Sequence, residues 1–226
     1  MALQDVKNSA VGIINEVMRK LGLKTVTNLS DTKLSSVLTD FLNDVVDEIS
    51  DYGDWHEMFR ETTVQSISSI GTYEIPVSGN VKNILEVSWD RQVSPLDVVS
   101  IEEILRLQRV GAKGGNPRNY AVVGVSANNP IIRISSIPTT AAPLVVAYYK
   151  KPAVIIAATA NNSAMPAFPA RMLVQGVYAK ALLEENGGTQ TPEYQVAYTE
   201  YQRMRNETLN RFNYDTGPNE IRFVPG

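Results

Sequence analysis

Apolar residues recur at helical spacing only near the two ends of this chain. Near the start, the spacing predicts helices over residues 3–21 and 31–51, the first ended by Gly22 and the second capped by Ser30 or Asp31. Near the other end it predicts helices over 168–185 and 192–213. A proline in the first turn suits a helix, because its missing N–H would have had no partner there. Residues that fit these helix starts are Pro169 for the first of the two, and Pro192 with a Thr191 cap for the second.

The residues between these helices follow a different pattern. Short apolar runs broken by glycine and proline are typical of strands and turns. One short helix, from Ser100 to Val110, interrupts them. The whole pattern predicts an α+β chain with an antiparallel helical bundle built from both chain ends and an inserted β-rich domain. The expected ranges are 1–52 and 165–213 for the bundle, 53–164 for the insertion and 214–226 for an extended C-terminal tail.

Charge and residue counts exclude several classes of function. The 226 residues carry a net charge of −3, which argues against a protein that grips DNA, since such proteins usually display a basic patch. The chain has no cysteine, which removes disulfides, thiolate metal sites and cysteine nucleophiles. The longest apolar runs are too short to span a bilayer. We therefore expect no cofactor and no metal.

The only histidine, His56, lies in the run Asp54-Trp55-His56-Glu57. A serine or cysteine triad needs a histidine base, and only this residue would serve. We interpret it as a structural residue where helix gives way to strand. The glycine-rich stretch 111–117 lacks the Gly-Lys-Ser/Thr ending of a phosphate-binding loop. The sequence therefore predicts no catalytic residue.

An acidic stripe accompanies the second predicted helix. Its members, all on one helical face, are Asp40, Asp44, Asp47 and Asp51. Paired carboxylates can perform acid–base chemistry. These aspartates flank an apolar stripe on its polar side, so we interpret them as a solvated face or as an acidic surface that faces a partner.

The last predicted helix carries a tyrosine stripe with arginines beside it. Tyr194, Tyr198 and Tyr201 share one helical face, and two interpretations stay open: packing in the bundle core, or contact with a partner subunit. Arginines 203, 205 and 211 are predicted to pair with acidic groups of the second helix, in the same chain or the next. The residues predicted for a subunit interface are Tyr194, Tyr198, Tyr201, Arg205, Asp44 and Asp47.

The C-terminal tail contains apolar residues but too few for a core of its own. The alternation Ile221-Arg222-Phe223 suits addition of a strand to a partner. The residues predicted for docking are Tyr214, Ile221, Arg222, Phe223 and Val224.

Several longer stretches together resemble one known family. These are the helix ending in Phe41-Leu42-Asn43-Asp44-Val45-Val46-Asp47-Glu48-Ile49, then Gly71-Thr72-Tyr73-Glu74-Ile75-Pro76, and Pro117-Arg118-Asn119-Tyr120-Ala121-Val122 with Ile132-Arg133-Ile134-Ser135-Ser136-Ile137-Pro138. The last are Val146-Ala147-Tyr148-Tyr149-Lys150-Lys151-Pro152, Pro166-Ala167-Phe168-Pro169 and the final Tyr/Arg helix. The chain resembles the head-to-tail adaptors of short-tailed bacteriophages, also called tail tubular protein A or head-completion proteins.

The resemblance implies a structural protein of the virion neck, made in the host cytoplasm and assembled as a dodecameric ring below the portal. Such a ring extends the channel through which genomic DNA passes, without sequence-specific binding and without a membrane. Its implied partners are the portal protein, the tail nozzle protein and neighbouring copies of the chain. In some members a C-terminal tail docks on the portal, a role that 214–226 would fill here.

Two other functions stay open. One is a cell-wall glycan hydrolase that uses two carboxylates, which requires a cleft with opposed acids and a raised pKa on one of them. The other is a cytosolic assembly scaffold or binding module that is not kept in the particle.

Overall fold

A computed structural model describes residues 8–66, 70–77, 80–89, 94–110, 115–127, 129–138, 140–158, 161–164 and 166–215. Five α-helices and two β-sheets lie in this part of the chain, which confirms the predicted α+β class. The chain divides into two compact units. A helical unit combines Met1–Glu57 with Pro152–Gly226, and a β-rich unit spans Met58–Lys151.

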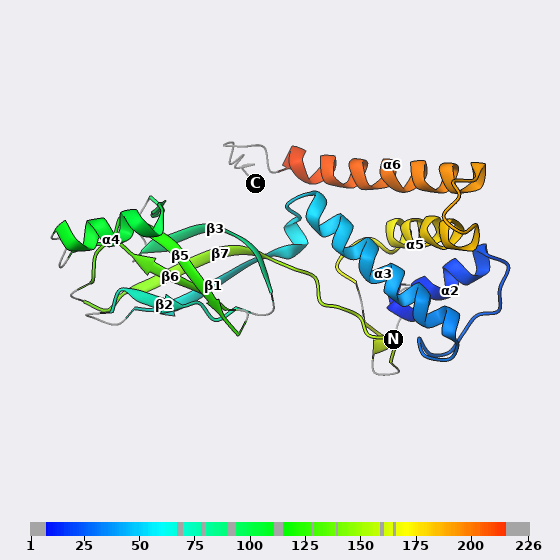
Figure 1. Ribbon diagram of the computed structural model, residues 1–226, viewed down its shortest axis with the longest axis horizontal. Helices are drawn as coiled ribbons and strands as arrows, with labels where there is room; N and C mark the ends of the chain where they lie inside the picture. The colour runs from blue at the N-terminus through cyan, green and yellow to red at the C-terminus, as the bar shows by residue number, and fades with distance from the viewer. Residues whose placement is uncertain are drawn as a thin grey trace, which may run out of the picture. The chain divides into compact units, whose positions relative to one another are not determined.

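Helix α5 (Ala170–Glu185) is the centre of the helical unit (Figure 1). It contacts all three other helices of the unit, which are α2 (Ala10–Lys20), α3 (Lys33–Tyr52) and α6 (Pro192–Asp215). A helix with neighbours on several sides must be apolar on several sides. The run from Met172 to Val177 is accordingly buried without interruption.

Side-chain caps begin helices α3 and α6, whereas Pro169 takes the N-cap position of α5 without a side-chain cap bond. Thr191 caps α6 as predicted, since its Oγ1 accepts a hydrogen bond from the Tyr194 amide at 3.2 Å. The predicted cap of α3 is wrong: the helix begins one residue after Thr32, whose side chain forms a reciprocal capping box with Ser35. Asp31 serves the preceding loop instead, where its carboxylate accepts bonds from the Thr27 and Asn28 amides at 2.8 Å.

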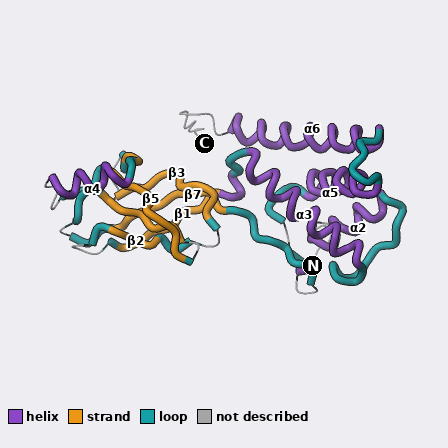
Figure 2. Tube along the Cα trace, viewed as in Figure 1, coloured by secondary structure: helices purple, strands orange, loops and turns teal. Residues whose placement is uncertain are grey.

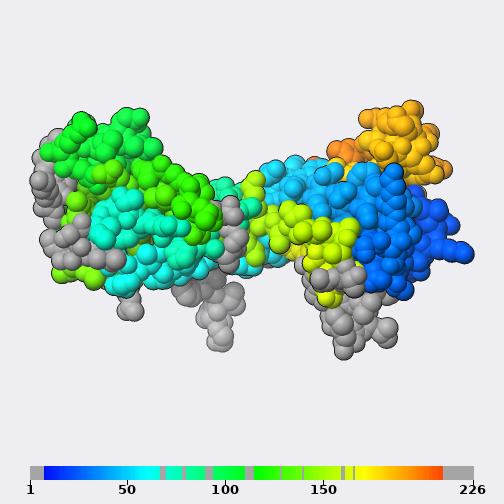
Figure 3. Space-filling view, turned by 60° about the horizontal axis from the view of Figure 1, so that its bottom comes forward, coloured from blue at the N-terminus to red at the C-terminus, as the bar shows by residue number. Residues whose placement is uncertain are grey.

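An extended strap, residues 152–158, runs along α3 before the chain enters α5. Figure 3 shows these yellow-green residues lying across the surface of the helical unit beside the blue and cyan residues of α3. The Asn43 side chain holds the strap with two hydrogen bonds of 2.8 Å, one to the Ile155 carbonyl and one from its amide. Ile155 is buried, while both of its neighbours are exposed.

The β-rich unit contains two sheets. The first is antiparallel, with the order β1 (Phe59–Gln65), β7 (Pro143–Lys150), β3 (Val81–Trp89). The second has the order β2 (Thr72–Glu74), β6 (Asn129–Ile134), β5 (Asn119–Ser126), β4 (Asp97–Val98), with only β4 and β5 parallel.

The two sheets share one core. A single buried cluster takes Val87, Trp89 and Val146 from the first sheet and Tyr120 and Ile132 from the second. Helix α4 (Ile101–Val110) begins with Ser100 as its cap, as predicted, and contacts β5 (Figure 2).

Strands β1 and β7 form a ladder in which Val64 and Gln65 pair with Leu144 and Pro143 at one end. At its other end Phe59 pairs with Tyr149, so the unit is entered and left on adjacent strands.

Candidate interaction surfaces

Arg205 joins helix α6 to helix α3 within one chain. Its guanidinium donates a 2.9 Å hydrogen bond to the Glu48 carboxylate and lies 3.8 Å from the centre of the Tyr52 ring. The Arg205 side chain is only 11% exposed. A cation over an aromatic face is attracted by the ring quadrupole, and the effect grows as water is excluded. The predicted pairing of a late arginine with an acid of the second helix thus occurs in the same chain.

The nearby Arg203 behaves differently. It pairs with Glu200 at 2.7 Å and with Glu207, both on its own helix, and half of its side chain is exposed. Pairs of this kind contribute little to stability, because water and salt screen them. Only one of these two arginines therefore links different helices.

The three tyrosines of α6 occupy different environments. Tyr201 is 1% exposed and packs against Gly176 of α5. Burial, and then the nearby Glu48 carboxylate, raise the pKa of the Tyr201 hydroxyl well above its ordinary value. Tyr194 and Tyr198 stack with ring centroids 5.5 Å apart and are only half-buried. These two rings keep an accessible edge, whereas Tyr201 is part of the chain's own core.

The acidic stripe of α3 lies at the surface. Asp40, Asp44, Asp47 and Asp51 are all exposed. Asp44 lies 3.6 Å from the ammonium of Lys180 on α5.

Of the residues predicted for docking in the C-terminal tail, Tyr214 belongs by its backbone to the last turn of α6. Ile221, Arg222, Phe223 and Val224 lie outside the described residues.

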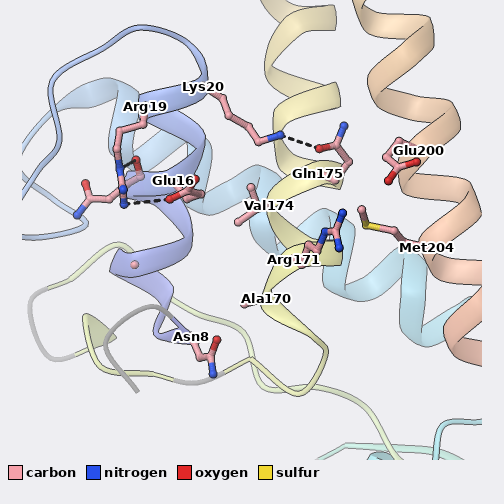
Figure 4. A pocket seen from close by; sticks show the side chains of 12 residues that line it. Asn8, Glu16, Arg19, Lys20, Ala170, Arg171, Val174, Gln175, Glu200 and Met204 are labelled. Atoms are coloured by element: carbon pink, nitrogen blue, oxygen red, sulfur yellow. Dashed lines mark hydrogen bonds and ion pairs between the residues drawn. The ribbon is translucent and has the colours of Figure 1, made fainter. Parts of the chain in front are cut away.

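A polar groove of about 670 Å³ lies between α2, α5 and α6 (Figure 4). Its wall contains three cations and two acids, which are Arg19, Lys20, Arg171, Glu16 and Glu200. Arg19 pairs with Glu16 at 3.0 Å, and Lys20 donates to the Gln175 side chain at 2.9 Å. Sequence reasoning did not identify this groove, because its residues come from three helices far apart in the chain.

Glu200, one of the two acids of the groove, does not have the raised pKa that a two-carboxylate hydrolase requires. A general acid needs a pKa raised towards neutrality. The pKa of Glu200 is instead lowered, chiefly by the hydrogen bonds it accepts from Arg203. The pKa values of Asp31, Glu102 and Glu103 are lowered as well, by hydrogen bonds to their carboxylates. Across the described residues no three His, Cys, Asp or Glu side chains are grouped so as to hold a metal ion.

Two apolar surfaces of the helical unit also could not be predicted from the sequence. One is the outer side of the strap, where Val154 is 70% exposed and Ile156 is 67% exposed. The other is an apolar groove of about 290 Å³ at the ends of α2 and α5 and the start of α3.

Within the described parts of the chain, no helix combines the length and the apolar character needed to cross a membrane.

The chain matches a known protein family over nearly its whole length. The model of the SU10 adaptor protein family matches residues 8–222 of the 226. No curated protein matches the chain.

Proposed function

Because this chain belongs to the SU10 adaptor protein family, we propose that it is a structural protein of the phage virion that forms a ring between portal and tail. In this role the ring extends the channel for DNA. The observation that carries the proposal is the extent of the family match, which leaves out only seven residues at the start and four at the end. The resemblance seen in the sequence is thereby confirmed at the level of the family.

The surfaces of the helical unit support an assembly role. The exposed acids of α3, the half-buried pair Tyr194 and Tyr198, and the exposed Val154 and Ile156 all belong to this unit. Charge and apolar area on one compact unit allow several modest contacts per copy. Such contacts become durable when a closed ring repeats them and all are made together.

We assign partners as follows. Neighbouring copies contact one another through the helical unit, including Tyr194, Tyr198, Asp44 and Asp47. The tail 214–226 docks on the portal, and the β-rich unit faces the tail nozzle. The net charge of −3 suits a wall that DNA passes without binding. The role is non-enzymatic, and the lowered pKa of Glu200 gives no support to the hydrolase alternative.

Mass photometry of the purified chain, alone and mixed with the portal ring of the same phage, tests the proposal. We expect a monomer or loose oligomer alone, and with the portal a discrete added mass equal to a full ring of chains. Deletion of 214–226 should abolish the added mass, while the circular dichroism of the helices stays unchanged. A chain that ignores the portal and is absent from purified virions would favour the cytosolic scaffold instead.

A further inference from the structure

The strap, residues 152–158, presents two large apolar side chains to solvent. Because Asn43 binds both the amide and the carbonyl of Ile155, the backbone is held with the Ile155 side chain inward and its neighbours outward. Val154 and Ile156 are therefore displayed side by side on a fixed segment. The strap is followed by a turn in which the Asn161 side chain donates to the Ile156 carbonyl at 2.9 Å. The backbone of the strap is thus held at Ile155 and at Ile156.

The apolar groove is a hollow that two side chains of this kind would fill. Seven of its nine lining side chains are aliphatic or aromatic, and one of them, Leu34, is 40% exposed. Two exposed carboxylates, Glu184 and Glu185, line it at the end of α5. The remaining lining residues are Leu21, Leu23, Val37, Leu38, Phe41 and Ala181.

Strap and groove lie on opposite sides of helix α3. At about 100° per residue, Leu34 is about 180° and Phe41 about 200° around the helix from Asn43. Asn43 holds the strap, while Leu34 and Phe41 line the groove. A strap cannot therefore reach the groove of its own chain. Complementary surfaces on opposite sides of one body make head-to-tail contacts, which close into rings when the rotation between copies allows.

We propose that Val154 and Ile156 of one copy insert into the apolar groove of the next copy. The charges agree with this choice of occupant. Lys150 and Lys151 directly precede the strap in the sequence, and Glu184 and Glu185 line the groove that receives it. The proposal deepens the proposed function, on which it rests, by naming the contact that joins neighbouring copies in the ring.

Disulfide cross-linking tests the contact cleanly, because the natural chain has no cysteine. The variant Leu34→Cys/Ile156→Cys, assembled on the portal ring and oxidised, should give a ladder of covalent multimers on a non-reducing gel. Reductant should collapse the ladder to monomer. The matched control is Leu34→Cys/Val196→Cys, which moves the second cysteine to an exposed valine of α6 and should stay monomeric.

Charge reversal tests the same contact without requiring two sulfur atoms to lie within bonding distance. The variant Glu184→Lys/Glu185→Lys should need at least a tenfold higher chain concentration to form the ring on the portal. Adding Lys150→Glu/Lys151→Glu to that variant should restore most of the loss. All four side chains lie at least partly in solvent, so circular dichroism should show each variant folded.

The outcomes separate this contact from the ring itself. If the natural chain forms no ring on the portal, the proposed function fails, and this contact fails with it. If rings form but the Leu34/Ile156 pair gives no ladder, the contact alone is overturned. If the variant Leu34→Cys/Phe223→Cys gives the ladder and the Leu34/Ile156 pair does not, the C-terminal tail of a neighbour fills the groove.

Discussion

Close packing at single residues decides which helices of this protein can approach each other. Gly176 of α5 lies where a Cβ atom would be 2.7 Å from Val45 Cγ1 and 3.0 Å from a ring carbon of Tyr201. Val45 and Tyr201 are themselves almost fully buried, so neither can move away freely. The absence of one side chain thus permits contact among α3, α5 and α6.

Gly176→Ala should destabilise the protein. Alanine favours a helix interior over glycine by about 1 kcal/mol, but overpacking a full core costs about 1–3 kcal/mol. The clash involves two rigid neighbours, so we expect a net loss of about 1–2 kcal/mol. Urea unfolding followed by circular dichroism measures it. Gly124→Ala is the control, because nothing lies within 4 Å of its added Cβ and the midpoint should barely shift. Equal midpoints for the two variants would contradict this account of Gly176.

A second residue-scale prediction concerns the buried arginine. Arg205→Ala leaves Glu48 without its partner and the Tyr52 ring without its cation, and should cost about 1–3 kcal/mol. Arg205→Lys should recover only part of this, since an ammonium lacks the planar face of guanidinium. The control on the same helix is Arg203→Ala, whose exposed pairs predict a change within about 0.5 kcal/mol. Thermal unfolding of the three variants is the measurement, and equal losses at both positions would be the contrary result.

At the scale of elements, side-chain amides replace regular secondary structure where the chain is irregular. Asn43 holds the strap through Ile155. Asn162 holds the loop before α3, accepting from the Leu29 amide at 3.0 Å and donating to Asn28 at 2.7 Å. An amide side chain offers a donor and an acceptor together, as a neighbouring strand would. These two residues fix segments that have no sheet partner of their own.

Asn43→Ala should release the strap without unfolding the helices. The Ile155 amide loses its acceptor, so its hydrogen exchange should accelerate at least tenfold, and thermal stability should fall by about 1–2 kcal/mol. Asp40→Ala, an exposed change one turn earlier on α3, is the control and should leave that amide unchanged. Unchanged exchange in the Asn43 variant would show that the burial of Ile155 alone holds the strap.

The loop before α3 carries a pH-dependent element. Hydrogen bonds from the Asn28 side chain and amide, and from Thr27, lower the pKa of Asp31 to about 2. Because folding lowers the pKa of Asp31, the ionised carboxylate stabilises the folded state at pH values above its ordinary pKa near 3.8. This stabilisation is lost as the pH falls towards 2. Titration of the Asp31 carboxyl carbon by NMR should show this midpoint. Asn28→Ala removes the largest cause and should return the midpoint towards 3.8. An identical midpoint in the variant would contradict the assignment.

At the scale of the whole molecule, the chain is two compact units with separate cores. The helical unit buries residues such as Leu38, Val45 and Val177. The β-rich unit buries a different cluster around Trp89 and Tyr120. The β-rich unit is entered and left on the adjacent strands β1 and β7, where Phe59 pairs with Tyr149. Neighbouring strands are about 5 Å apart, so a short linker can bridge the two crossing points.

Replacement of 58–151 by a four-residue glycine-serine linker should leave the helical unit folded. Cooperative thermal unfolding and helical circular dichroism are the measurements, and the excised segment 58–151 should fold separately with a sheet spectrum. Loss of cooperativity in both fragments would show that the two units depend on each other for stability.

The sequence alone determined the kind of each main element. Helical and strand periodicity is a local property, because it follows from backbone geometry over a few residues. The caps Ser100 and Thr191 could also be predicted, since a cap bonds to an amide three residues away. The predicted α3 cap is wrong because Ser30, Asp31 and Thr32 all have capping side chains, and the sequence does not distinguish them. The family too followed from stretches of sequence, and the match over 8–222 bears it out.

Only the tertiary structure decided which side chains meet. The tyrosine stripe of α6 fits a core or a partner equally well in sequence, and packing alone buries Tyr201 while leaving Tyr194 and Tyr198 half-buried. The strap and the apolar groove join residues more than a hundred positions apart, such as Asn43 with Ile155 and Leu34 with Glu184. Such contacts depend on how helices pack and how loops close, and no local spacing encodes them. That is why the helices could be predicted from the sequence and the surfaces they build together could not.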